Sequence, residues 1–270
     1  MDLQKFYEKA QEILLEMAES KSLSEESLEK YYTADICLSD ATIEKIFERM
    51  VGSMQNRSMM PNVIKFWQEN GSVNAKHKEI LCDFKPSEIL KKYADAEALF
   101  NAFEDKGLVN QEHPKLFKQW SKSIVSGARF MCEFKDLADL KNAFDAFQQN
   151  GLMKDALPAV LSYKIDGFGF TLACDFLKEI GYDYPKPDTY IKAIVKKMTR
   201  QEEVKEYTAY KEILKIAEKI KRLKKVDEQY HFVYKLDKIL WLIGSGMFYK
   251  NNAKTSGRMR ELIEWIEKNP

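Results

Sequence analysis

The chain has 270 residues, of which 45% are hydrophobic and 12% are aromatic, a composition that supports a packed core and excludes an intrinsically disordered chain. No run reaches the roughly 18 apolar residues of a membrane span, and the acidic, amphipathic start lacks the pattern of a secretory signal. The net charge of +1 is too small to indicate a class of partner.

The distribution of charge along the chain is more informative than its sum. Residues 1–48 contain twelve Asp or Glu and five Lys, whereas residues 186–225 contain thirteen Lys or Arg and six Asp or Glu. A polyanion is attracted to the second stretch and repelled by the first. Two solvated helix faces of opposite charge would give the same pattern, so both interpretations stay open.

The four cysteines, Cys37, Cys82, Cys132 and Cys174, are widely and irregularly spaced. This spacing argues against a disulfide framework and a zinc site, and it excludes the tight four-cysteine loop of an iron–sulfur cluster. Scattered thiols fit a reducing compartment, so we expect a cytoplasmic protein. The three histidines are also dispersed, and no metal site is expected.

Helical periodicity dominates the chain from its start. Apolar residues recur at three- and four-residue steps over residues 3–17, and a second helix runs to about Met50 from a cap at Ser39 or Asp40. Residues 52–61 are predicted to form a turn. Further helices are predicted at 62–70, 86–104, 114–130, 136–149, 152–164, 189–199, 202–223, 229–243 and 257–268. No segment alternates long enough for a convincing strand, so the predicted fold class is all-α.

One segment, residues 157–194, carries more information than the rest. An apolar helix face ending near Ile165 is interrupted at 166–169 by Asp-Gly-Phe-Gly, and a second apolar helix then runs to Gly181. Two glycines around one apolar residue allow a tight turn with positive φ. The N–H groups and the dipole of the following helix favour an anion such as a phosphate. The pattern predicts a helix-hairpin-helix, although a plain interhelical turn has the same residues.

A rigid connector follows the second helix. Pro185 and Pro187 restrict the backbone, and Pro187 pushes Lys186 into an extended conformation. Asp188 then stands at the start of a helix over residues 189–197. An aspartate in this position is an ordinary helix N-cap, and its carboxylate is also a candidate for chemistry.

In this order and spacing the residues resemble the helix-hairpin-helix–Gly/Pro–Asp superfamily of DNA glycosylases. The matching residues are Ile165, Gly167, Phe168, Gly169 and Ala173 in the hairpin, and Pro187, Asp188 and Ile191 in the Gly/Pro–Asp part. The close match covers about 35 of the 270 residues. The resemblance implies base-excision repair on double-stranded DNA. It also implies a monovalent cation at the hairpin as the one candidate cofactor.

By position, the resemblance assigns the catalytic role to Asp188, whose carboxylate would stabilise the positive charge that develops on the sugar. Bifunctional members carry a Schiff-base lysine two residues after the second glycine of the hairpin, where this chain has Thr171. The resemblance therefore implies a monofunctional glycosylase that uses water. Tyr190 stands where many members have a histidine, and the sequence offers no account of this departure.

Other contacts with DNA are also implied by the resemblance. The residues expected at the DNA are Gly167, Phe168, Gly169, Thr171, Gln55, Asn56, Arg57, Lys186 and Lys192. Residues 55–57 would fill the gap left by an extruded base, and the two lysines would contact phosphates. Trp241 and Phe248 would line the base pocket. A polar interhelical turn and core aromatic residues are the alternative interpretations.

The expected architecture is two helical domains with a cleft between them. Residues 1–55 and 186–270 would form one domain and residues 56–185 the other, with the helix-hairpin-helix at about 154–181. The favoured function is a monofunctional DNA N-glycosylase. The alternatives are a non-catalytic helix-hairpin-helix DNA-binding protein and an unrelated helical interaction protein. No membrane and no obligate protein partner are expected, and in a bacterium the protein would associate with the nucleoid.

Overall fold

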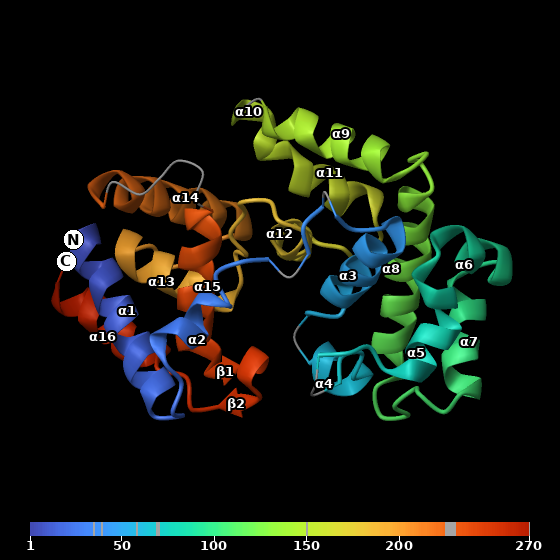
Figure 1. The fold of residues 1–270 in the computed structure, drawn as a ribbon, viewed down its shortest axis with the longest axis horizontal. Coiled ribbons are helices and arrows are strands. Elements are labelled where there is room, and N and C mark those ends of the chain that lie inside the picture. Colours follow the sequence, from blue (N-terminus) through green and yellow to red (C-terminus); the bar gives the residue numbers. More distant parts are fainter. Residues whose placement is uncertain are drawn as a thin grey trace. The chain divides into compact units, whose positions relative to one another are not determined.

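The computed structural model describes residues 1–34, 36–38, 40–57, 59–68, 71–149, 151–224 and 231–269, apart from the side chain of Leu152. Most of these residues are helical, which confirms the predicted all-α class (Figure 1). The chain divides into two compact units, of which unit 1 comprises Met1–Asp35 and Gly181–Pro270, and unit 2 comprises Ile36–Ile180. Unit 1 is therefore discontinuous in sequence, whereas unit 2 is continuous.

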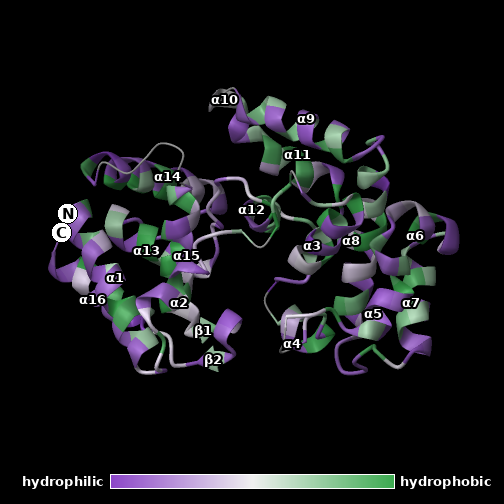
Figure 2. Cartoon of the chain, viewed as in Figure 1, coloured by the Kyte–Doolittle hydropathy of each residue, from purple (hydrophilic) through white to green (hydrophobic). Residues whose placement is uncertain are grey.

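Unit 1 is built around one central helix. Its helices are α1 (Leu3–Glu19), α2 (Glu25–Glu29), α13 (Thr189–Thr199), α14 (Glu206–Leu223), α15 (Phe232–Ser245) and α16 (Met259–Lys268). Helix α15 packs against α1, α13, α14 and α16, and most of its residues are hydrophobic (Figure 2). After α15, the short antiparallel strands β1 (Met247–Phe248) and β2 (Ala253–Lys254) flank the 3₁₀ turn η2 (Tyr249–Asn251).

Opposite charges meet inside unit 1. Lys224 at the end of α14 lies 2.8 Å from Glu8 on α1, and Arg258 before α16 lies 2.6 Å from Glu16. The acidic N-terminal stretch is thus partly neutralised by Lys224 of the basic stretch 186–225 and by Arg258, which lies beyond that stretch. Such exposed pairs stabilise the fold only weakly, but they reduce the basic charge that remains for an external polyanion.

Unit 2 surrounds the long helix α8 (Pro114–Met131), which packs against α3, α4, α6, α7 and α11. The other elements are α3 (Ile43–Met54), α4 (Met60–Ile64), α5 (Ala75–Ile80), the 3₁₀ turn η1 (Cys82–Phe84), α6 (Pro86–Lys92), α7 (Ala96–Asp105), α9 (Leu137–Gln148), α10 (Gly151–Lys154), α11 (Ala156–Lys164) and α12 (Phe170–Glu179). The rings of Phe66, His77, Phe103 and Trp120 form the centre of the core, with centroids 5.2 to 5.9 Å apart in the contacting pairs.

Several predicted boundaries differ from those of the structure. Residues 36–55 belong to unit 2 rather than to the N-terminal part, because α3 buries its apolar face against α8 and α12. The predicted helix over 86–104 is two helices, since the Asp95 carboxylate accepts a hydrogen bond from Ala98 N–H and starts α7. The N-cap of α3 is Thr42, not Asp40, and the other predicted cap, Ser39, lies outside the described residues.

Candidate functional site

The predicted hairpin is a helix–turn–helix in unit 2. Helices α11 and α12 pack against each other and are joined by residues 165–169. Gly167 has φ +68°, a conformation that favours glycine. Phe168 is only 1% exposed, its ring lies 6.2 Å from that of Phe176, and its N–H donates to Ile165 O over 3.1 Å. The Phe168 side chain therefore anchors the turn in the core, and it is not on the surface expected to meet DNA.

Two serines of α8, Ser123 and Ser126, contact the turn at residues 165–169. Ser126 Oγ accepts a hydrogen bond from Asp166 N–H over 2.9 Å and donates to Lys122 O over 3.0 Å. A Cβ added at Gly167 would lie 2.9 Å from Ser123 Oγ. These serines were not predicted as part of the site, and their spacing of three on one face of a predicted helix was their only signal in the sequence.

The start of α12 is open. Gly169 is the N-cap residue and is exposed, and among the described residues no side chain caps this helix and no atom lies within 4 Å of a Cβ added at Gly169. Side-chain oxygens cap the helices that follow Asp2, Ser24, Thr42, Asn74, Asp95, Asp136 and Asp188, whereas in the described part of the chain α4, α6, α8, α11, α14, α15 and α16 lack a side-chain cap as α12 does. Helix dipole and backbone thus create partial positive charge at an approachable surface, with Thr171 half-buried in the first turn.

The connector that carries Asp188 lies in unit 1 and is held by α15. Lys186 N–H donates to the buried Asp237 carboxylate over 2.7 Å, and Tyr234 N–H donates to Asp183 over 2.8 Å. Lys186 is only 9% exposed, which does not suit the expected phosphate contact. Lys192, in contrast, lies half-exposed on α13.

Asp188 itself is half-buried at the N-terminus of α13. Its Oδ1 accepts hydrogen bonds from Tyr190 N–H over 2.9 Å and from Ile191 N–H over 3.2 Å. These two donors fix the carboxylate relative to the helix axis. The position is neither sealed in the interior nor fully solvated, as a carboxylate that meets a substrate requires.

Packing explains why a tyrosine stands at position 190, where many members of the glycosylase superfamily have a histidine. Its ring lies against the backbone of Gly244 on α15, so closely that a Cβ at Gly244 would be 2.5 Å from a ring carbon. Burial, and secondarily the negative charge of Asp188, raises the pKa of the Tyr190 hydroxyl. The packing of Tyr190 against Gly244 therefore fixes the first turn of α13, and with it Asp188, relative to α15.

The loop after α3 differs from expectation. Gln55 is 2% exposed, and its Oε1 is buried with no hydrogen-bond partner among the described atoms. It cannot enter a DNA duplex from this position. Asn56 Nδ2 donates to Asp175 Oδ2 on α12 over 2.9 Å, and Arg57 is exposed. Of the three predicted residues, only Arg57 presents its side chain to an outside partner.

Asp175 belongs to a buried group of charges that the sequence analysis did not single out. Arg49 Nη2 lies 3.8 Å and Lys178 Nζ lies 4.0 Å from its carboxylate, and Lys178 Nζ lies 3.9 Å from Glu179. Asp175, Lys178 and Glu179 are all less than 5% exposed. Charged residues within an otherwise apolar helix were the signal. The group ties the loop at 55–57 to the helix that begins at the hairpin.

The two aromatic residues expected in a base pocket have different environments. Phe248 is fully buried and packs edge-on against Tyr31 at 6.3 Å, so it belongs to the core of unit 1. Trp241 is half-buried, and its ring lies 5.9 Å from that of Tyr249, which is 39% exposed. Tyr249 rather than Phe248 is the accessible ring at this place.

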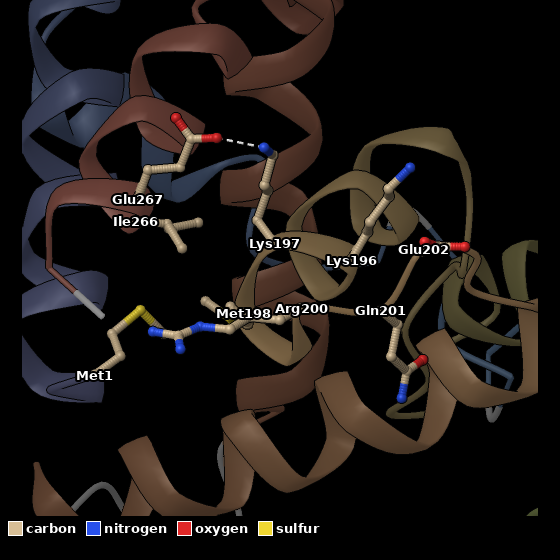
Figure 3. A pocket seen from close by; sticks show the side chains of 9 residues that line it. All are labelled: Met1, Lys196, Lys197, Met198, Arg200, Gln201, Glu202, Ile266 and Glu267. Atoms are coloured by element: carbon tan, nitrogen blue, oxygen red, sulfur yellow. Dashed lines mark hydrogen bonds and ion pairs between the residues drawn. The ribbon is translucent and has the colours of Figure 1, made fainter.

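A pocket of about 640 Å³ lies on unit 1 at the C-terminal end of α13 (Figure 3). Its lining residues are Met1, Lys196, Lys197, Met198, Arg200, Gln201, Glu202, Ile266 and Glu267. Lys197 is ion-paired with Glu267. Helix α13 has 11 residues, which at 1.5 Å per residue places this basic pocket roughly 16 Å from Asp188. It is too far to act on the same sugar, but it lies on the same helix.

The described residues contain no group of three or more His, Cys, Asp and Glu side chains able to hold a metal ion. In the same part of the chain, no helix has the length and apolar character needed to cross a membrane. Comparisons with protein-family models, with curated proteins and with solved structures find no match for this chain.

Proposed function

We propose that the protein binds duplex DNA and hydrolyses the N-glycosidic bond of a damaged or mismatched base, as a monofunctional DNA glycosylase. One observation carries the proposal. An open, glycine-capped helix start at Gly169 is followed, about twenty residues later, by Asp188, a half-buried carboxylate fixed at the start of another helix. The helix start at Gly169 can bind an anion such as a phosphate. The Asp188 carboxylate can stabilise the positive charge of an oxocarbenium-like sugar.

The hairpin supplies the sequence-independent part of binding. A phosphate that approaches Gly169 meets no side chain of that residue and lies at the positive end of the α12 dipole. The half-exposed Lys192 and the exposed Arg57 add cationic groups in their own units. Such contacts give affinity that falls with salt and carry no base preference.

The absence of a lyase step rests on where the nearby lysines are engaged. Thr171 occupies the position of the Schiff-base lysine. Lys164 lies 3.1 Å from Glu133 in an ion pair, and Lys178 is buried beside Asp175 and Glu179. Neither lysine is presented at the open start of α12. A water molecule is therefore the proposed nucleophile, and the product is an unbroken strand with an abasic site.

The test replaces Asp188 with Asn, which caps a helix as well as Asp does and so preserves α13. Base release from a panel of duplexes, each with one modified base, is measured by alkaline cleavage of the abasic product. We expect a loss on the order of 100-fold or more, with DNA affinity within a few fold of wild type. Parallel samples without alkali check that the strand stays intact.

Asp2→Asn is the matched control, because Asp2 caps α1 in the same unit through the same kind of side-chain bond. Full activity in Asp2→Asn and undiminished activity in Asp188→Asn would together refute the catalytic assignment. Loss of activity in both variants would instead indicate a general effect of weakened capping in unit 1.

A second candidate is a non-catalytic helix-hairpin-helix DNA-binding protein. It is favoured by the two hydrogen bonds from the backbone to Asp188, since capping alone gives this residue a structural role. This candidate predicts salt-dependent duplex binding without base release from any duplex of the panel. If duplex binding is negligible even at low salt, an unrelated helical interaction protein is the remaining interpretation.

A further inference from the structure

We propose that α13 carries a phosphate track, in which Lys192, Lys196 and Arg200 bind phosphates of one DNA strand on one side of the base to be excised. The inference rests on the proposed function for the identity of the polyanion as DNA. It deepens that function by adding Lys196 and Arg200 to the residues at the DNA, and by giving the strand a path over unit 1 that starts at Asp188.

Helix α13 differs from its neighbour α14 in the balance of its charges. Residues 189–201 contain four Lys or Arg and no Asp or Glu. Helix α14 packs against α13 and carries both signs, and its Lys215 and Arg222 are paired with Glu212 and Glu218 at 2.6 and 2.9 Å. The positive charge of α13 is therefore not balanced within its own helix.

Three of the four cationic residues of α13 and its C-cap follow one another at intervals of one turn. Lys192, Lys196 and Arg200 are four residues apart, which corresponds to a rise of about 6 Å from each to the next. Among the described residues, none of these three side chains takes part in a hydrogen bond or an ion pair, whereas Lys197 is paired with Glu267. Like charges one turn apart repel each other, and a row of bound phosphates would remove this repulsion.

The track ends in the pocket at the C-terminal end of α13. Lys196 and Arg200 both line this pocket, and Figure 3 shows Arg200 extending across it towards Met1. Glu202 also lines the pocket and follows Arg200 by two residues. Its carboxylate would repel a strand that continued further, so the pocket is the last phosphate site on this side.

Arg200 has a backbone conformation that favours glycine. It follows the last residue of α13 with φ +57° and ψ +28°, in the left-handed region. Glycine is the usual residue at such a helix end, because a Cβ is strained there. The chain thus keeps a guanidinium group at the pocket where glycine would relieve strain, and this indicates a role for Arg200 outside folding.

The length of α13 determines how far along the strand the track reaches. The helix has 11 residues, so the pocket lies roughly 16 Å from Asp188. One nucleotide advances a duplex strand by about 3.4 Å along the axis. A strand that runs along α13 from Asp188 therefore presents to Arg200 a phosphate about five nucleotides from the excised base.

The test measures duplex binding by the full-length protein through fluorescence anisotropy over a series of KCl concentrations, and it needs no turnover. Each phosphate contact adds about 0.9 to the steepness with which log affinity falls with log salt concentration. Lys192→Gln, Lys196→Gln and Arg200→Gln should each lower this salt slope by about 0.9, and the triple variant by about 2.7.

Lys219→Gln is the matched control for the loss of one charge. Lys219 is an exposed lysine of α14 in the same unit, and its side chain has no ion pair among the described residues. Because it lies off the track, its replacement should leave the salt slope unchanged.

Arg200→Gly separates binding from stability. Relief of the left-handed strain should keep or raise the midpoint of thermal unfolding, while loss of the guanidinium should lower the salt slope as Arg200→Gln does. Lys65→Gly is the matched control, since Lys65 is an exposed cation with φ +52° after α4 in unit 2. It should have the same effect on the midpoint and leave the salt slope unchanged.

Duplexes shortened from one end at a time test the path of the strand. With fewer than about five base pairs on one side of the modified base, wild type and Arg200→Gln should bind with equal affinity. The same shortening on the other side should preserve the difference between them.

Three results would overturn the track: an unchanged salt slope in the triple variant, an equal decrease in Lys219→Gln and the single track variants, or equal sensitivity to shortening on both sides. Base release that depends on Asp188 with unchanged slopes refutes the track alone. Lower slopes without base release from any duplex refute glycosylase activity alone, whereas absence of duplex binding by wild type at low salt refutes both.

Discussion

Gly167 and Gly169 lie two residues apart, yet a methyl group would have opposite consequences at the two positions. At Gly169, φ is −61° and a Cβ would point into open space, so Gly169→Ala should cost no more than about 1 kcal/mol of stability. If a phosphate approaches this backbone, the same methyl group should lower duplex affinity several-fold. Urea unfolding and fluorescence anisotropy with a labelled duplex measure the two effects.

Gly167→Ala should mainly lower the stability of the protein. Its φ of +68° and the contact with Ser123 Oγ make an added Cβ strained, at a cost of about 1–2 kcal/mol. Gly151→Ala, where a Cβ also meets no described atom within 4 Å, is the control for an innocuous substitution. Unchanged DNA affinity in Gly169→Ala would remove the hairpin from the proposed contact.

His77 gives unit 2 a specific sensitivity to acid. It is 1% exposed among aromatic rings, neither ring nitrogen has a hydrogen-bond partner among the described atoms, and burial lowers its pKa to about 4. The unfolded chain binds a proton at this residue below about pH 6.5, whereas the folded chain does not. Stability from this group is complete above that pH and is lost as the pH falls towards 4, by up to about 3 kcal/mol.

Urea unfolding of wild type and His77→Leu at pH 7 and near pH 4.5 measures this contribution. The loss of stability between the two pH values should be smaller in the variant, because Leu does not titrate. Carboxylates contribute equally to both proteins, so an identical loss in wild type and variant would show that His77 is protonated inside the fold.

At the scale of elements, the contact between α13 and α15 depends on one glycine. A Cβ at Gly244 would lie 2.5 Å from the Tyr190 ring, whose position is set by the helix that Asp188 caps. Gly244→Ala should therefore destabilise unit 1 by about 1–3 kcal/mol and displace Asp188. Gly127→Ala is a useful contrast, since its Cβ would meet the flexible end of Met54 at the same 2.5 Å. Thermal unfolding should show a clearly larger effect at Gly244.

The elements themselves were largely predictable from the sequence, because apolar periodicity and glycine or aspartate signals are local. The predicted starts at residues 114 and 189 agree with α8 and α13. The burial of Gln55 and Phe248 was not predictable. Both depend on which helices pack together, and a single polar or aromatic residue beside a turn gives no sign of that. The buried bonds of Asp175 and Asp237 depend on partners far away in sequence for the same reason.

At the scale of the whole molecule, the two units differ in whether a single fragment of the chain can fold as the isolated unit. Unit 2 is one continuous stretch, Ile36–Ile180, with its own aromatic core around Trp120. A fragment of residues 36–180 should therefore fold alone, with a helical circular dichroism spectrum and a cooperative thermal transition. Residues 181–270 alone should not, because α15 would expose the face that α1 covers. A fragment 36–180 without a cooperative transition would show that unit 2 depends on unit 1.

The discontinuity of unit 1 also has a consequence for biosynthesis. Helix α1 leaves the ribosome before any of unit 2, but its partners α14, α15 and α16 follow only after residue 180. At about 5–20 residues per second, α1 waits on the order of 10 to 30 seconds for them. During this interval its apolar face, with Phe6, Ile13 and Leu14, is without its native cover. The acidic residues on the rest of the helix then keep nascent chains apart by mutual repulsion.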